Sequence, residues 1–223
     1  MDKTNVLLTG GSRGIGLAIK RRFEAEGCNV IAPSREEMNL LSRDSVLNYL
    51  RSIDGPVDVL VNNAGINFIE PIENMSLEKL EETLEVNTIA PFLLSQYCIK
   101  NFFLKQKRGC IINIGTVWIA KNRIGRSTYT MSKAALESIT KSLAIEFGDR
   151  NITCNMISPG FIGTDLTYRN NSKQELDTII DSVPIKRLGK VEEIAELTVY
   201  LSLKNNLMTG QNVYIDGGIS QSF

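Results

Sequence analysis

The chain has 223 residues, of which 43% are hydrophobic and 22% charged, a composition that fits one folded domain with a substantial core. Its 25 basic and 25 acidic residues balance, so charge gives no reason to expect nucleic acid or an acidic membrane surface as a partner. The absence of histidine removes the usual proton carrier near neutral pH and disfavours a structural zinc site.

The amino terminus and the cysteines do not suggest export. The chain begins MDKTNVLLTGG, whose apolar run is too short for a signal peptide, and no apolar stretch reaches transmembrane length. The cysteines, Cys28, Cys98, Cys110 and Cys154, form no CxxC pair, and a cysteine in an apolar strand usually serves as a small core residue. We therefore expect a reduced cytoplasmic protein with no metal site and no membrane partner.

Apolar, β-branched runs alternate along the chain with segments of helical period. Strands are predicted at 5–10, 28–33, 57–63, 110–115, 152–158 and 212–216. Helices are predicted at about 14–26, 43–53, 77–104, 129–147 and 191–203. Strands this apolar suit a parallel sheet covered on both faces, so the alternation predicts an α/β fold with a three-layer, doubly wound sheet of the Rossmann type.

The least regular stretch of the chain is 160–185, with one short polar helix predicted at about 172–181. An irregular segment this late in such a fold lies beside the expected site, so 160–185 is a candidate substrate lid. No internal repeat, low-complexity tract or linker divides the chain, and residues 1–223 are predicted to form a single domain.

The turn between the first strand and the first helix is rich in glycine. It reads TGGSRGIG, and Gly10, Gly14 and Gly16 would permit a tight turn that lets the backbone approach a pyrophosphate closely. Phosphate oxygens would then meet the free N–H groups and the dipole of the helix amino terminus. Tight turns need glycine for steric reasons alone, but the position at the first strand-to-helix junction favours a nucleotide site.

Four further motifs come after this turn, in order. They are NNAG at 62–65, the YxxxK within TYTMSK, SPGFIGTD at 158–165 and VYIDGG at 213–218. Together with TGGSRGIG they resemble the short-chain dehydrogenase/reductase family, over nearly the whole chain from Val6 to Gly218. The resemblance implies a dinucleotide-binding catalytic domain that acts on CH–OH or C=O groups, and the motifs are most similar to those of the 3-oxoacyl-[acyl-carrier-protein] reductases.

The resemblance also implies which residues bind the cofactor. Those expected to contact a nicotinamide dinucleotide are Gly10, Ser12, Arg13, Gly14, Ile15, Gly16, Ser34, Arg35, Asn39, Leu40, Asn63, Ala64, Gly65, Tyr129, Lys133, Pro159, Gly160, Ile162 and Thr164. The last four of these would line the nicotinamide, with the backbone at Ile162 reaching its carboxamide.

The tip of the second strand predicts which cofactor is bound. An acidic residue there would accept hydrogen bonds from the adenosine ribose and repel a 2′-phosphate. The chain instead reads IAPSRE, so that Ser34 and Arg35, together with Arg13, could clamp a phosphate. Glu36 and Glu37 come directly after Arg35 and could compete for the arginine. We expect NADP(H) in preference to NAD(H).

Here the chain departs from the family, which usually places a full helix between its second and third strands. Only EE separates Arg35 from MNLLSRDSV, a segment that is similar to the family's third strand and the residues after it. Asn39 and Leu40 then fall at the positions that usually contact adenine. We therefore expect the helix to be missing and the adenine to be more exposed than usual.

Tyr129 and Lys133 lie four residues apart, which places them on one face of a helix. An ordinary phenol titrates near ~10, but a cation about 4 Å away at an effective dielectric constant near ~20 favours the phenolate by on the order of 4 kcal/mol, roughly three pKa units. The resemblance makes Tyr129 the general acid that protonates the carbonyl oxygen. Lys133 would hold the nicotinamide ribose and lower the pKa of the phenol.

The resemblance adds two further catalytic residues. Thr116 stands where the family almost always uses serine to bind the substrate oxygen, and threonine keeps the hydroxyl but is stiffer at χ1. Asn87 would hold a proton-relay water on its backbone carbonyl, which is free because Pro91 has no N–H to donate to it. A simple helix break between 77–86 and 91–104 is the competing interpretation. Trp118 is either a pocket wall or a core residue.

The sequence therefore predicts an NADPH-dependent carbonyl reductase, most similar to 3-oxoacyl-thioester reductases, with a small-molecule carbonyl or alcohol substrate. Lys107 and Arg150 fall where those enzymes carry basic residues for the acidic carrier protein. Two alternatives stay open: a reductase or dehydrogenase of a sugar, polyol or nucleotide-sugar, and a non-catalytic NADP(H)-binding regulator. The family commonly forms tetramers, and the apolar FLLSQYCIKNFFL within 77–104 is compatible with a helix–helix interface in a homo-oligomer, dimer or homotetramer.

Overall fold

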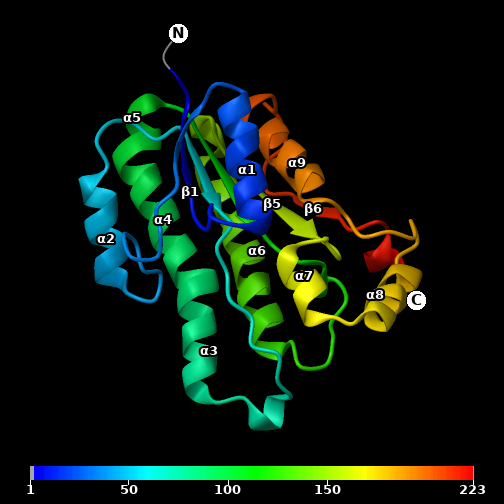
Figure 1. Ribbon diagram of the computed structural model, residues 1–223. Helices are drawn as coiled ribbons and strands as arrows, with labels where there is room; N and C mark the ends of the chain where they lie inside the picture. The colour runs from blue at the N-terminus through cyan, green and yellow to red at the C-terminus, as the bar shows by residue number, and fades with distance from the viewer. Residues whose placement is uncertain (1–2, 223) are drawn as a thin grey trace.

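Six parallel strands form the centre of the computed structural model, which describes residues 3–222 (Figure 1). They are β1 (Asn5–Leu8), β2 (Asn29–Ile31), β3 (Val59–Asn62), β4 (Gly109–Ile114), β5 (Ile152–Pro159) and β6 (Asn212–Ile215). Their order in the sheet is β2-β1-β3-β4-β5-β6. This order confirms the doubly wound sheet and places its switch point, where such folds bind ligands, between β1 and β3.

Helices cover both faces of the sheet. They are α1 (Gly14–Ala25), α2 (Arg43–Ser52), α3 (Leu77–Leu84), α4 (Ala90–Cys98), α5 (Leu104–Gln106), α6 (Ser127–Phe147), α7 (Asp165–Asn170), α8 (Lys173–Ser182) and α9 (Val191–Leu203). In β1, Val6 and Leu8 pack in the core under α1 and α9, whereas Leu7 packs in the core under α2 and α4. All three side chains are fully buried, which explains why this strand is apolar at successive positions.

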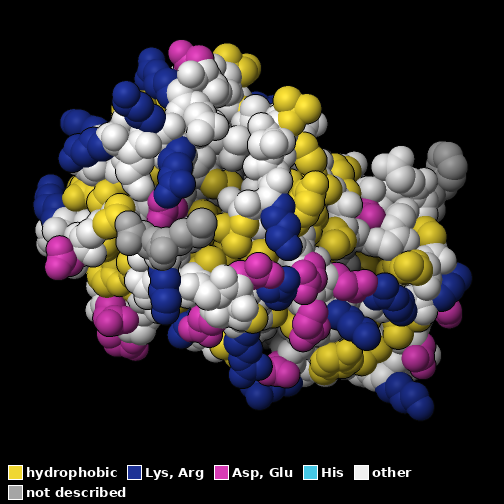
Figure 2. Space-filling view, turned by 90° about the horizontal axis from the view of Figure 1, so that it is seen from above, with side chains coloured by type: hydrophobic (Ala, Val, Ile, Leu, Met, Phe, Trp, Pro, Cys, Tyr) yellow, Lys and Arg dark blue, Asp and Glu magenta, His cyan; other side chains and the backbone are white. Residues whose placement is uncertain are grey.

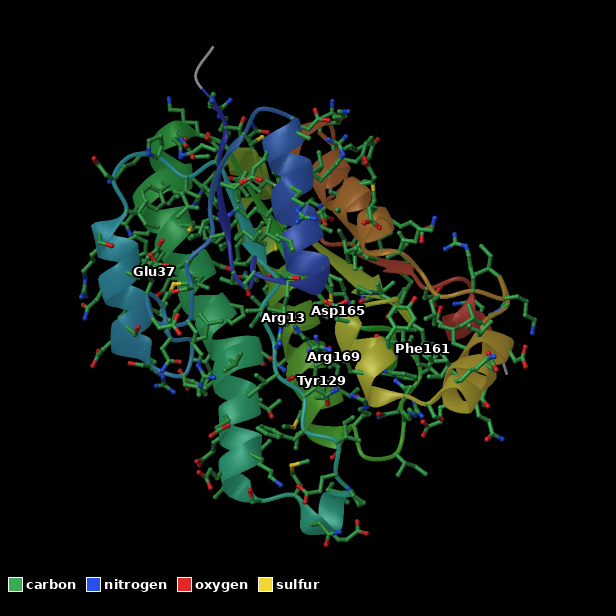
Figure 3. The ribbon with its side chains drawn as sticks, in the orientation of Figure 1. Arg13, Glu37, Tyr129, Phe161, Asp165 and Arg169 are labelled. Carbon is green, nitrogen blue, oxygen red and sulfur yellow. The ribbon has the colours of Figure 1, made fainter. Side chains whose placement is uncertain are left out.

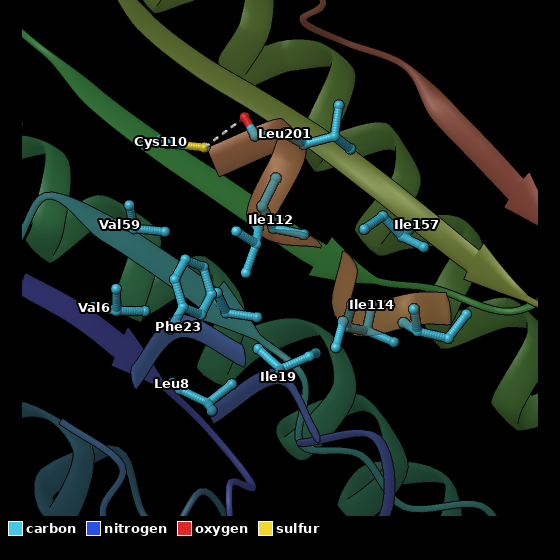
Figure 4. Close-up of a cluster of buried hydrophobic side chains, with 14 of the residues drawn as sticks. Val6, Leu8, Ile19, Phe23, Val59, Cys110, Ile112, Ile114, Ile157 and Leu201 are labelled. Carbon is cyan, nitrogen blue, oxygen red and sulfur yellow. Dashed lines mark hydrogen bonds between the residues drawn. The ribbon is translucent and has the colours of Figure 1, made fainter. Parts of the chain in front are cut away.

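The core under α1 determines where the glycine-rich turn lies. Figure 4 shows Phe23 and Ile19 of α1 lying against Val6, Leu8 and Val59 of the sheet, and none of the five is more than 2% exposed. Full burial of a side chain of this kind contributes about 1.5–3 kcal/mol. Because α1 is held along β1 in this way, its amino terminus stays at the carboxyl edge of the sheet.

The predicted helix 77–104 is confirmed as one continuous helical segment. α3, α4 and α5 are joined end to end by two π-helical turns, Glu85–Ile89 and Ile99–Phe103. No break occurs at Pro91, so the competing interpretation is wrong. The first π-helical turn accommodates the proline, because the N–H of Ala90 reaches five residues back to the carbonyl of Glu85.

The connection after β2 lacks a helix, as predicted, but it also lacks the strand that was expected to follow. Turns, and no helix, separate β2 from the segment 38–41, as expected. That segment is not a third strand, because its backbone pairs locally: the N–H of Asn39 donates to Ser45 Oγ at 3.0 Å, and the N–H of Leu41 donates to Asn39 Oδ1 at 3.1 Å. With its polar groups satisfied there, the segment joins no sheet, and β2 forms the edge.

The candidate lid contains two short helices where one was predicted. α8 corresponds to the expected polar helix and begins with a capping box, in which Ser172 and Glu175 exchange hydrogen bonds. α7 was not predicted. It starts because the hydroxyl of Thr164 accepts a hydrogen bond from the N–H of Thr167 at 3.2 Å.

Candidate active site

A cleft of about 990 Å³ opens at the carboxyl ends of β1, β3, β4 and β5. Every residue that the sequence predicted to contact the cofactor lines this cleft, and so do Thr116 and Trp118. Asn87 lies beneath its surface. The sheet therefore brings four of the five motifs to one cleft, and VYIDGG at 213–218 does not line it.

The glycine-rich turn is shaped by positions at which a side chain cannot fit. Gly10 and Gly14 have φ values of +69° and +52°, a region that glycine enters without strain. A Cβ on Gly16 would lie 1.9 Å from the carbonyl oxygen of Gly10, so any other residue would force the turn apart from α1. These glycines are structurally required, and together they bring the backbone close to the cleft.

The amino terminus of α1 has free donors for an anion. Arg13 is the residue before the helix, and no side chain caps the N–H groups of the first turn. Uncapped N–H groups and the helix dipole favour negative charge, which suits a pyrophosphate. Thr164, at the start of α7, approaches Gly14 from the opposite side of the cleft.

Asn63 and Thr9 hold the turn in place. The side-chain amide of Asn63 donates to the carbonyls of Thr9 and Gly10, both at 3.0 Å. The hydroxyl of Thr9 accepts hydrogen bonds from the N–H groups of Asn63 and Ala64, also at 3.0 Å. Asn63 therefore positions the glycine turn. The contribution of Thr9 was missed, and its place directly before the glycines was the available signal.

At the tip of β2, the carboxylate of Glu37 already binds Ser34, one of the residues expected to bind phosphate. Glu37 accepts a hydrogen bond from the N–H of Ser34 at 2.7 Å, and the Ser34 hydroxyl accepts one from the N–H of Glu37 at 3.3 Å. Glu37 was expected to compete for Arg35, but it binds Ser34 instead. Within residues 3–222, neither Arg13 nor Arg35 forms an ion pair. Figure 3 shows Glu37 well apart from Arg13.

Lys133 is buried at 3% exposure, and its ammonium donates to the carbonyl oxygen of Ile114 at 2.8 Å. Burial lowers the pKa of Lys133 to about 8, because the charged form loses its hydration. A Cβ on Gly65 would lie 3.5 Å from this ammonium, so glycine at 65 leaves the space beside it open.

The expectation that Lys133 makes Tyr129 acidic is wrong for the chain on its own. Burial raises the pKa of Tyr129 above its ordinary value, and the Thr116 hydroxyl and the Arg126 charge lower it only in part. Lys133 is not among the groups that lower the pKa of Tyr129, and its ammonium donates to the carbonyl of Ile114 instead. The phenol is therefore protonated near neutral pH.

Thr116 and Trp118 form the wall next to Tyr129. Thr116 comes after β4, is 6% exposed, and accepts a hydrogen bond on its hydroxyl from the N–H of Trp118 at 3.4 Å. The half-buried Trp118 ring meets Phe161 edge to face, with 5.5 Å between ring centroids. Of the two interpretations of Trp118, the structure supports the pocket wall.

Asn87 uses its whole side chain to join three segments. Its amide donates to the carbonyl of Ile66 at 2.8 Å and to the Ser132 hydroxyl at 3.0 Å, and its Oδ1 accepts from the N–H of Ile66 at 2.9 Å. The residue is fully buried in the π-helical turn. Asn87 thereby fixes the loop after β3 against α6 one residue before Lys133. Ser132 was not identified from the sequence.

Pro159, Gly160, Ile162 and Thr164 continue the cleft beyond β5. A Cβ on Gly160 would lie 2.6 Å from Cα of Asp216, so glycine lets this segment pass close to the end of β6. Ile162 pairs with Gly189 in an isolated β-bridge. These contacts hold the base of the candidate lid in place over the cleft.

Two negative observations concern metals and membranes. In the described part of the chain, no group of three or more acidic or cysteine side chains could hold a metal ion. None of the helices there is both long enough and apolar enough to cross a membrane.

The family model described as Enoyl-(Acyl carrier protein) reductase matches residues 38–220. The chain is 35% identical to the 3-oxoacyl-[acyl-carrier-protein] reductase FabG of Aquifex aeolicus, and 35% identical to FabG of Escherichia coli, with 96% of each chain covered in both comparisons. Taken with the cleft and its motifs, these matches identify the chain as a member of the short-chain dehydrogenase/reductase family of oxidoreductases.

Solved structures extend the comparison to other substrates. A 4-hydroxyisoleucine dehydrogenase complexed with NADH superposes with a TM-score of 0.93 at 30% identity, covering 99% of this chain and 100% of that one. The aldohexose dehydrogenase of Thermoplasma acidophilum gives a TM-score of 0.92 at 28% identity, covering 99% and 95%. Within this family, the chain thus resembles reductases of acyl-carrier substrates in sequence, whereas similar structures include dehydrogenases of small molecules.

Proposed function

We propose that the chain is a carbonyl reductase that uses NADPH to convert a ketone to a secondary alcohol. The observation that supports this most directly is that Tyr129, Thr116 and Lys133 line the same cleft as the glycine-rich turn. The uncapped amino terminus of α1 and the glycines fit a dinucleotide pyrophosphate. A bound nicotinamide would supply the hydride.

In this proposal the chain's own residues position and protonate the substrate oxygen. The Thr116 hydroxyl donates a hydrogen bond to the carbonyl oxygen, and Tyr129 gives up its proton as negative charge develops there. With its pKa raised, Tyr129 carries its proton at neutral pH and can donate it in the reductive direction. Lys133 holds the ribose and the proton relay, and the Asn87 carbonyl accepts a hydrogen bond from the relay water.

We further propose NADP(H) as the cofactor, because Arg13 and Arg35 line the cleft without an ion-pair partner in residues 3–222. Two guanidiniums suit a 2′-phosphate. The Glu37 carboxylate opposes this choice, since a phosphate approaching the Ser34 N–H would have to displace it. Both effects can be measured, and their balance decides the preference.

A 3-oxoacyl thioester is the first candidate substrate, from the likeness to the FabG reductases. The prediction that Lys107 and Arg150 contact the carrier protein when its substrate is in the cleft is wrong. Lys107 lies just before β4 and Arg150 just before β5, at the amino-terminal edge of the sheet, opposite the cleft. Figure 2 looks onto that edge and shows basic, acidic and hydrophobic side chains sharing the surface.

A small hydroxy or oxo compound, such as a sugar or polyol, is the second candidate. It is supported by the likeness to the aldohexose dehydrogenase structure and by the short adenosine side of the cleft. A non-catalytic NADP(H)-binding regulator remains the alternative of another class. The presence of all four catalytic residues around one cleft favours an enzyme.

One experiment separates these functions. NADPH consumption is measured with acetoacetyl thioesters, keto-sugars and simple ketones, and Tyr129→Phe is expected to lower kcat at least about 100-fold, because general acid catalysis is lost. NADPH binding, monitored by its fluorescence, should change by no more than about twofold. NADPH binding without turnover of any ketone would contradict the enzyme and support the regulator.

A further inference from the structure

Arg126 is a basic residue of the cleft that the proposed reaction does not use. It immediately precedes α6, three residues before Tyr129, and its side chain lines the cleft. Its N–H donates to the carbonyl of Arg123 at 3.2 Å, and its own carbonyl accepts from the N–H of Thr130 at 2.8 Å. These bonds hold the backbone at Arg126 in place at the start of the helix that carries the phenol.

The guanidinium of Arg126 has no partner in the part of the chain that the structure describes. It forms neither an ion pair nor a side-chain hydrogen bond there. The residue is half-buried, and burial, together with weaker repulsion from Arg123, lowers the pKa of Arg126. An unpaired charge that is partly removed from water is costly, and an anionic ligand would offset that cost.

The acidic side chains that line the cleft do not supply an anion for Arg126. The basic side chains that line it are Arg13, Arg35, Arg126, Lys133 and Arg169, and the acidic ones are Glu82 and Asp165. Neither acid is paired with Arg126 within residues 3–222. Arg13 and Arg35 are proposed for the cofactor phosphate and Lys133 for the ribose. Arg126 and Arg169 therefore remain, and Arg126 is the one that directly precedes α6, three residues before Tyr129.

We propose that Arg126 binds a carboxylate of the substrate, which is then a small oxo acid or the corresponding hydroxy acid. A guanidinium offers paired N–H donors that match the two oxygens of a carboxylate. Because Arg126 is three residues before Tyr129 and both side chains line the cleft, we expect the carboxylate to lie within a few bonds of the carbonyl whose oxygen Tyr129 protonates. This inference rests on the proposed reaction and favours small acids over thioesters, which carry no charge near the ketone.

The test compares acetoacetate with methyl acetoacetate, which present the same ketone with and without the carboxylate charge. The wild-type enzyme is expected to have the higher kcat/KM for the acid. Arg126→Gln should reduce the acid-to-ester ratio of kcat/KM about 10- to 100-fold, the loss typical of one charge-assisted hydrogen bond. Arg126→Lys should retain part of the preference. Arg108→Gln is the matched control, because that side chain pairs with Asp58 at the opposite edge of the sheet and does not line the cleft, and it should leave the ratio within about twofold.

Binding gives a second readout that does not need turnover. Acetoacetate is titrated into the enzyme–NADPH complex, and the change in NADPH fluorescence is recorded for the wild type and for Arg126→Gln. A wild-type ratio near one, a ratio that Arg126→Gln does not change, or no acid binding to the complex overturns the carboxylate assignment. Acid binding that depends on Arg126, with no ketone reduced, overturns the proposed reaction and supports the assignment.

Discussion

At the residue scale, polar side chains in the cleft divide into those already satisfied and those left open. The amide of Asn63 donates, and that of Asn87 donates and accepts, within the protein, and both fix backbone positions. Arg13, Arg35 and Arg126 form no ion pair in the described residues, although all three line the cleft. The first group positions the site, and the second is available to ligands.

Cofactor choice is tested at this scale with Arg35→Ala. The change should weaken NADPH binding about tenfold or more and NADH binding by no more than about twofold, because only NADPH carries the 2′-phosphate and a hydrogen bond to a charged group contributes about 1.5–3 kcal/mol. Glu37→Gln should shift the preference towards NADPH, since it removes the negative charge from the Ser34 N–H. Dissociation constants come from titrating the fluorescence of each reduced cofactor.

Arg108→Ala is the control for these variants. Its guanidinium pairs with Asp58 at 3.1 Å at the opposite edge of the sheet, so neither cofactor should be affected. Equal losses of NADPH and NADH on Arg35→Ala would contradict the phosphate clamp.

At the scale of elements, the π-helical turn Glu85–Ile89 is the feature that links the long helix to the reaction centre. Pro91 prevents regular α-helical pairing at Asn87, and the wider turn keeps the helix continuous. Asn87 then reaches both the loop after β3 and the middle of the YxxxK motif on α6. The helix and the catalytic pair are therefore held together through one amide.

Asn87→Ala should lower the free energy of unfolding by about 2–4 kcal/mol, because three hydrogen bonds are lost and the backbone groups of the half-buried Ile66 are left without these partners. Chemical unfolding in urea measures this loss. Asn101→Ala is the matched control from the same helical segment, since its side chain makes one bond, to the carbonyl of Tyr97, and should cost about 1 kcal/mol or less. Similar losses in the two variants would mean that Asn87 does not join the three segments.

At the scale of the whole molecule, the outer sides of two helices expose large hydrophobic side chains. α4 and α6 cover the same face of the sheet, and both carry exposed large hydrophobic side chains: Phe92 is 44% exposed and Ile145 is 85% exposed. We propose that these exposed faces pair in a homo-oligomer, a dimer or a tetramer.

Light scattering on the purified protein should give the mass of a dimer or a tetramer. Ile145→Glu should reduce that mass at equal concentration, because a charge buried at a helix–helix interface is costly. Ile124→Glu, at a position 90% exposed on the loop before α6, should leave the mass unchanged. A monomeric wild-type protein would contradict the proposed assembly.

The sequence by itself determined the sheet, its helices and the five motifs, because apolar periodicity and glycine requirements are local properties of the chain. It also predicted the missing helix after β2, since a chain of two residues cannot form one. The resemblance of MNLLSRDSV to the family's third strand did not hold, because the backbone of this segment bonds to nearby side chains such as Ser45.

Only the tertiary structure decided which charges are neighbours. Lys133 and Tyr129 share a helix face, yet packing gives the ammonium to the carbonyl of Ile114, and the charge that lowers the pKa of Tyr129 is that of Arg126. Lys107 and Arg150 proved to be at the edge opposite the cleft. Electrostatic effects depend on distance and burial, which are set by how distant segments pack, so sequence spacing alone does not specify them.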